Sequence, residues 1–112
     1  MQRDDSVYLK HIRDAILTIE KYTKRTSAPS FQKNTLIQDG VIRQIEIIGE
    51  AAKRLSVKIR TENTDIPWQD IAGMRDKLIH DYFGVDIEKV WLTVRNDIPL
   101  LKKQINRILK NL

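Results

Sequence analysis

An arginine, a histidine and a tyrosine lie close together in the segment GMRDKLIHDYFG, residues 73–84. Histidine can transfer protons near neutral pH, and arginine offers a permanently charged fork of donors. Such groups suit cleavage of RNA by its ribose 2′-hydroxyl, which needs a base, an acid for the leaving 5′-oxygen and a cation beside the phosphorane. Arg75, His80 and Tyr82 are therefore the first candidates for chemistry in this chain.

A regular helix would keep these three side chains apart. At about 100° per residue, Arg75 and Tyr82 share one face, whereas His80 points about 140° away from Arg75. The groups could converge if the helix unwinds after His80, since DYFG ends at a glycine suited to a left-handed cap. Asp76, four residues before His80, could pair with the imidazole and orient it.

A second copy of the chain offers another route to convergence. One chain supplies a single candidate catalytic histidine, whereas a two-fold dimer supplies two histidines and two arginines around a shared cleft. The alternative is that Arg75 and His80 are surface or capping groups at a helix end, which is the commoner role for such residues. His11 lies beside the apolar seam of the first helix and is interpreted as structural.

Composition limits the classes of function. The 112 residues fit one domain, 1–112, and 41% apolar with 31% charged residues is typical of a soluble helical protein. No apolar run reaches membrane-spanning length, and the N-terminus MQRDDSVYLK lacks a signal core, so we expect a cytoplasmic protein without membrane contact. The net charge of +5 favours an anionic partner such as nucleic acid, or reflects a surplus of surface lysines.

Cysteine is absent from the whole sequence. This excludes disulfides, thiol nucleophiles and cysteine-ligated zinc. The two histidines are far apart and form no metal-binding motif, so we expect neither a metal site nor a cofactor.

Apolar spacing predicts an all-α, antiparallel bundle of four to five helices, and seams of this length also permit dimerisation. Expected breaks follow from KRTSAPS, TENTDIP and the segment ending at Gly84, with Ser30 as a possible cap after the first break and Asp86 after the last. Gly49 is expected where a neighbouring helix approaches closely, Pro67 at the start of the third helix, and Pro99 where the last helix kinks or divides. The predicted seams are Tyr8, Ile12, Ala15, Ile19 and Tyr22; Val41, Ile45, Ile48, Ala52, Leu55 and Ile59; and Ile87, Trp91, Val94, Ile98, Leu101, Ile105, Ile108 and Leu112, with Trp68 as a further core aromatic.

The pattern R-x-x-x-x-H-x-Y resembles the signature of HEPN-domain ribonucleases, specifically the HepT toxins. The blocks YLKHIRDAI, VIRQIEIIGEAAKRLS, IPWQDIAGMRDKLIHDYFGVD and VWLTVRNDIPLL extend this resemblance over nearly the whole chain, in the family's order. Asp76 departs from the family pattern, which usually has asparagine there. A carboxylate would raise the pKa of the histidine and place negative charge near RNA.

The resemblance implies a dimeric, metal-independent endoribonuclease toxin of a type VII toxin–antitoxin system. Arg75 would stabilise the scissile phosphate, and His80 would act as general acid or base. Asp76 and Glu50 would support the motif, although Glu50 could equally be an ordinary solvated carboxylate. The partner would be a minimal nucleotidyltransferase antitoxin, MntA-like, that transfers AMP onto Tyr82.

Two other functional hypotheses are compatible with the sequence. The chain could be a non-catalytic HEPN module that binds nucleotide or acts as a scaffold for a neighbouring nucleotidyltransferase. It could also be a helical dimerisation domain without a site, which would leave the full signature unexplained.

Overall fold

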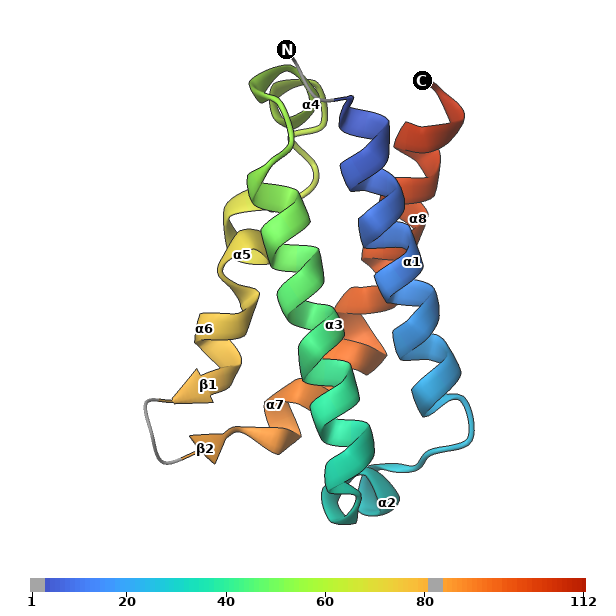
Figure 1. The fold of residues 1–112 in the computed structure, drawn as a ribbon, viewed down its shortest axis with the longest axis vertical. Coiled ribbons are helices and arrows are strands. Elements are labelled where there is room, and N and C mark those ends of the chain that lie inside the picture. The colour runs from blue at the N-terminus through green and yellow to red at the C-terminus, as the bar shows by residue number, and fades with distance from the viewer. Residues whose placement is uncertain (1–3, 81–83) are drawn as a thin grey trace.

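The computed structural model describes residues 4–80 and 84–112, with the side chains of residues 79 and 80 outside the description. The chain forms an elongated helical bundle with principal extents of 43 × 30 × 24 Å (Figure 1). Its elements in chain order are α1 (Asp5–Thr23), α2 (Ala28–Lys33), α3 (Thr35–Lys53), α4 (Val57–Glu62), α5 (Trp68–Ala72), α6 (Met74–Leu78), β1 (Ile79–His80), β2 (Gly84–Val85), α7 (Ile87–Leu92), the π-helical turn η2 (Thr93–Asp97) and α8 (Ile98–Lys110).

Helix α3 lies at the centre of this arrangement (Figure 1). It packs antiparallel to α1 on one side and against α5 and α6 on the other. Helix α8 lies along α1, while α2 packs against α7 at the end of the bundle opposite the two chain ends. The expected all-α bundle is confirmed, and no described helix combines the length and apolar character needed to cross a bilayer.

The predicted seams form one continuous core. All six seam residues of the second predicted helix are buried, as are the first four of α1. Tyr22 was wrongly placed in the core, because it is 40% exposed beside Gly40. Leu112, at the last position of the described chain, is also exposed. Of the two tryptophans, Trp68 is buried and Trp91 is half-buried against Phe31.

Several predicted helix boundaries need correction. The second helix is two helices, because α3 ends at Lys53 and Ser56 caps the separate α4 through a bond from the Ile59 N–H. The cap of α2 is Ser27, which accepts a bond from the N–H of Ser30, so Ser30 is not the cap. Local capping chemistry divides the helix, although the apolar seam continues through both pieces.

The last predicted helix divides near Pro99, as expected. Pro99 has no N–H to donate to the carbonyl of Arg95, and the five residues before α8 adopt a π-helical turn. Asp86 caps α7 by accepting a bond of 3.1 Å from the Lys89 N–H, as predicted. Helix α5 begins directly after Pro67, which agrees with the predicted start.

The third predicted helix differs most from expectation. It breaks at Gly73 and ends at Leu78, two residues before His80, instead of continuing toward Gly84. Strands β1 and β2 then pair antiparallel, with Ile79 opposite Val85, so a minimal hairpin stands where no strand was predicted. Gly84 has a φ of +134°, which favours glycine, but it serves β2 and not a helix cap.

Candidate active site

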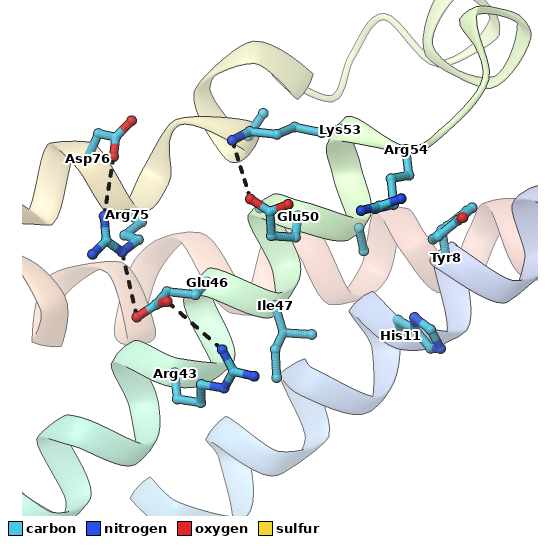
Figure 2. A pocket seen from close by; sticks show the side chains of 13 residues that line it. Tyr8, His11, Arg43, Glu46, Ile47, Glu50, Lys53, Arg54, Arg75 and Asp76 are labelled. Atoms are coloured by element: carbon cyan, nitrogen blue, oxygen red, sulfur yellow. Dashed lines mark hydrogen bonds and ion pairs between the residues drawn. The ribbon is translucent and has the colours of Figure 1, made fainter.

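A groove of about 570 Å³ crosses the face formed by α1, α3, α5 and α6. Figure 2 shows Arg75 and Asp76 at one end and Tyr8, His11 and Arg54 at the other. Its charged lining consists of four cations and three carboxylates: Arg43, Lys53, Arg54 and Arg75 with Glu46, Glu50 and Asp76. The groove therefore carries a small positive excess.

Close contact between two helices builds the Arg75 end of the groove. A Cβ atom on Gly49 of α3 would lie 3.1 Å from the carbonyl oxygen of Ala72, at the end of α5. The glycine thus permits the close approach that the sequence predicted. Helix α6 follows directly and places Arg75 beside α3.

Arg75 is held at the groove by two carboxylates. Its Nε atom lies 3.6 Å from Oε1 of Glu46, and its Nη1 atom lies 3.7 Å from Oδ1 of Asp76. The Arg75 side chain remains 50% exposed, so its guanidinium is accessible to an anion in the groove. Glu46 also lies 4.0 Å from Nη1 of Arg43 and therefore bridges two arginines.

The structure brings together only part of the predicted site. Glu50 lines the same groove one helical turn after Glu46, but its carboxylate lies 3.4 Å from Nζ of Lys53. The carboxylate beside Arg75 is that of Glu46, which sequence reasoning missed. The signal was available, because Arg43, Glu46 and Glu50 recur at helical spacing on one face.

The main chain of His80 lies in β1, but its side chain is outside the described part. Tyr82 lies wholly outside the described residues. The helix ends at Leu78, which removes the regular geometry that would hold His80 away from Arg75. Their convergence, and the roles of Arg75, His80, Asp76, Glu50 and Tyr82, stay predictions.

His11 lies on the surface of α1, beside the apolar seam. It is exposed and lines the groove, and its ring meets the ring of Tyr8 edge-on at a centroid distance of 6.2 Å. Among the described residues, no three histidine or acidic side chains gather as a metal site would require.

Comparison with known proteins places the whole bundle in context. A family model described as "Ribonuclease HepT-like" matches residues 12–108. The chain is 43% identical over 110 residues to a Thermococcus cleftensis protein named "Probable ribonuclease HepT", covering 98% of this chain and 100% of that protein. A Caldanaerobacter subterraneus subsp. tengcongensis protein named as a "Putative RNase" is 42% identical over 103 residues, covering 92% of each chain.

A longer relative has a name that gives two activities. A Methanocaldococcus jannaschii protein named "Gamma-glutamylcyclotransferase and putative RNase" is 46% identical over 112 residues. The match covers 100% of this chain but only 50% of that protein. No solved structure matches the chain.

Proposed function

This chain belongs to the HepT-like ribonuclease family, and from that premise we propose that it is a metal-independent endoribonuclease acting as a toxin. Its active site would combine Arg75 and His80 from two protomers. The names of the relatives already suggest ribonuclease activity. We propose three further points: the residues of the active site, its formation by two protomers, and its control by an antitoxin.

The observation that carries the proposal is the setting of Arg75. A half-exposed guanidinium faces a groove, and Glu46 engages its Nε edge. Asp76 lies 3.7 Å from Nη1 on the other edge, and the Arg75 side chain as a whole remains 50% exposed for a phosphate to approach. A guanidinium that is oriented in advance stabilises a phosphorane without the cost of ordering it during the reaction.

The proposed reaction needs no bound metal. A base removes the proton of a ribose 2′-hydroxyl, and the oxygen attacks the adjacent phosphorus. The bond from phosphorus to the 5′-oxygen breaks as an acid protonates that oxygen, which leaves a 2′,3′-cyclic phosphate and a 5′-hydroxyl. His80 would serve one proton role and the partner's His80 the other, while Arg75 stabilises the extra negative charge.

Control by an antitoxin follows the same electrostatic logic. A nucleotidyltransferase partner that transfers AMP from ATP onto Tyr82 would add a negative phosphate and a bulky nucleoside near the site. Repulsion and steric blockage would then both oppose RNA binding. An intact-mass measurement after co-expression with the neighbouring gene product tests this control. Added AMP on a peptide containing Tyr82 supports it, whereas unmodified protein with stoichiometric nucleotide favours a non-catalytic module.

Cleavage assays in EDTA test the ribonuclease directly. Unmodified wild-type protein should cleave a labelled RNA, and Arg75→Ala and His80→Ala should each abolish cleavage. Arg25→Ala, in the exposed loop after α1, removes the same charge far from the motif and should leave cleavage unchanged. Full activity in both motif variants would refute the proposed site.

A further inference from the structure

The excess positive charge of the groove lies at the end opposite Arg75. Arg43 and Arg75 both contact Glu46, and Lys53 contacts Glu50. Among the described residues, no carboxylate lies within ion-pair distance of Arg54, although it is exposed and lines the same groove. Figure 2 shows its guanidinium turned toward the groove. This end is therefore better suited to an anion than the rest of the lining.

An aromatic surface lies beside this cation. The exposed ring of His11 comes from α1 and lines the same end of the groove as Arg54, the C-cap residue of α3, with Tyr8 nearer to Arg54 in the view of Figure 2. Tyr8, one turn earlier on α1, is buried and supports the His11 ring from its edge. An exposed ring and a cation along one groove is the combination on which single-stranded nucleic acids bind, through base stacking and a phosphate contact.

The two ends of the groove are separated along α3. Arg54 follows Glu46 by eight residues along α3, which corresponds to about 12 Å along the helix axis. This spacing allows Arg54 and Arg75 to contact different phosphates of one strand. One strand lying along the groove would meet both.

We propose that Arg54 and His11 form a second RNA subsite, which binds a phosphate and an unstacked base of the strand outside the point of cleavage. This inference rests on the proposed ribonuclease function and adds how the substrate is held. The subsite contributes to the binding of long strands and takes no part in bond breaking.

Binding of a fluorescent single-stranded RNA oligonucleotide, measured by anisotropy at several salt concentrations, tests the subsite. Arg54→Ala should weaken binding about fivefold or more and reduce the slope of log affinity against log salt by about 0.7, the value for one lost phosphate contact. Arg54→Lys should keep the slope, and Arg25→Ala serves as the charge-matched control. His11→Ala should weaken binding about fivefold or more, and His11→Phe should restore it, because either ring can stack on a base.

Cleavage kinetics separate this inference from the proposed function. Arg54→Ala and His11→Ala should raise KM for a long RNA while kcat stays within about twofold, and a dinucleotide substrate should be insensitive to both. If wild type cleaves RNA but both variants match it in affinity and KM, the subsite is refuted and the ribonuclease stands. If wild type cleaves nothing, the ribonuclease fails, and the anisotropy series alone decides the subsite.

A contact between two copies of the chain is the competing use of this groove end. Sedimentation of the same variants distinguishes it. A change in oligomeric mass for Arg54→Ala with unchanged RNA affinity would overturn the inference, whereas unchanged mass with weaker RNA binding supports it.

Discussion

The Nε atom of Arg75 lies 3.6 Å from a carboxylate oxygen of Glu46, across the interface between α6 and α3. If Arg75 binds the scissile phosphate as proposed, a carboxylate beside it weakens its attraction for RNA. The benefit is orientation, since Glu46 at the Nε atom and Asp76 at the Nη1 atom hold the guanidinium in place while half of the side chain stays exposed. The pair is partly exposed and contributes only about 0–1 kcal/mol to stability.

Replacing Glu46 should therefore affect turnover more than folding. We expect Glu46→Ala to lower kcat for RNA cleavage by about 10- to 100-fold, because a displaced catalytic group loses rate steeply. KM should stay the same or fall as a negative charge leaves the groove. Glu46→Gln should recover part of kcat, since its amide oxygen keeps a partial negative charge beside the Arg75 Nε atom. Steady-state kinetics on one RNA provide both constants.

The matched comparison is Glu50→Ala. Glu50 lies one turn away on the same groove face but contacts Lys53, so we expect a smaller loss of kcat. A larger loss for Glu50 than for Glu46 would favour the brace expected from the sequence and contradict the orienting role of Glu46.

The close approach of α3 and α5 yields a second prediction. Gly49→Ala would place a methyl group 3.1 Å from the Ala72 carbonyl oxygen, a backbone atom that can move only with α5. Overpacking of this kind lowers the free energy of unfolding by about 1–3 kcal/mol, and the better helix propensity of alanine offsets about 1 kcal/mol of that loss. We expect a loss of about 1 kcal/mol in unfolding free energy, measured by urea denaturation, together with reduced cleavage as α6 moves away.

Gly73→Ala is the control for that experiment. A Cβ atom there would lie 3.5 Å from the Gln69 carbonyl oxygen, an ordinary contact. Stability and cleavage should both stay near the wild-type values. If Gly49→Ala also leaves stability and cleavage unchanged, the contact between α3 and α5 does not position Arg75.

The sequence predicted the bundle well because its core follows helical periodicity. The apolar seams, the role of Gly49, the Asp86 cap and the division near Pro99 can all be derived from local spacing and backbone chemistry. The end of α6 could not be derived, because LIHDYF contains no glycine or proline that would mark a helix end. The hairpin could not be derived either, because it depends on pairing of Ile79 with Val85 and of His80 with Gly84. The spacing of Arg43, Glu46 and Glu50 places Glu46 on the groove face, but it does not show which carboxylate meets Arg75, because Arg75 lies on another helix.

Gly84 provides a test of the hairpin that carries His80. Its φ of +134° is a conformation that side chains with a Cβ rarely adopt, although space around it is open. Gly84→Ala should therefore cost about 1–3 kcal/mol through backbone strain alone. We expect faster amide hydrogen exchange at Ile79 and Val85 and reduced RNA cleavage, with α1 and α3 unaffected. Unchanged exchange at both strand positions would show that the strain is not present in solution.

An ion pair between Asp65 and Arg107 gives a prediction about pH. Nη2 of Arg107 lies 2.8 Å from Oδ2 of Asp65, and this hydrogen bond holds the pKa of the Asp65 carboxyl below its ordinary value. A lowered pKa in the folded state stabilises the protein above the ordinary carboxyl pKa, and that contribution is lost as pH falls through the lowered value. Arg107→Ala should move the Asp65 pKa upward, which carboxyl NMR titration measures. A titration that does not move would mean that the pair does not form in solution.

The ends of the RNA fragments test the central claim most directly. Unmodified protein should be incubated with a defined RNA in EDTA, and the fragments identified by mass spectrometry. Attack by the 2′-hydroxyl at Arg75 and His80 predicts fragments that carry a 2′,3′-cyclic phosphate and a 5′-hydroxyl, and intact RNA with Arg75→Ala. Fragments that carry a 3′-hydroxyl and a 5′-phosphate, or the same fragments from Arg75→Ala, would contradict the account.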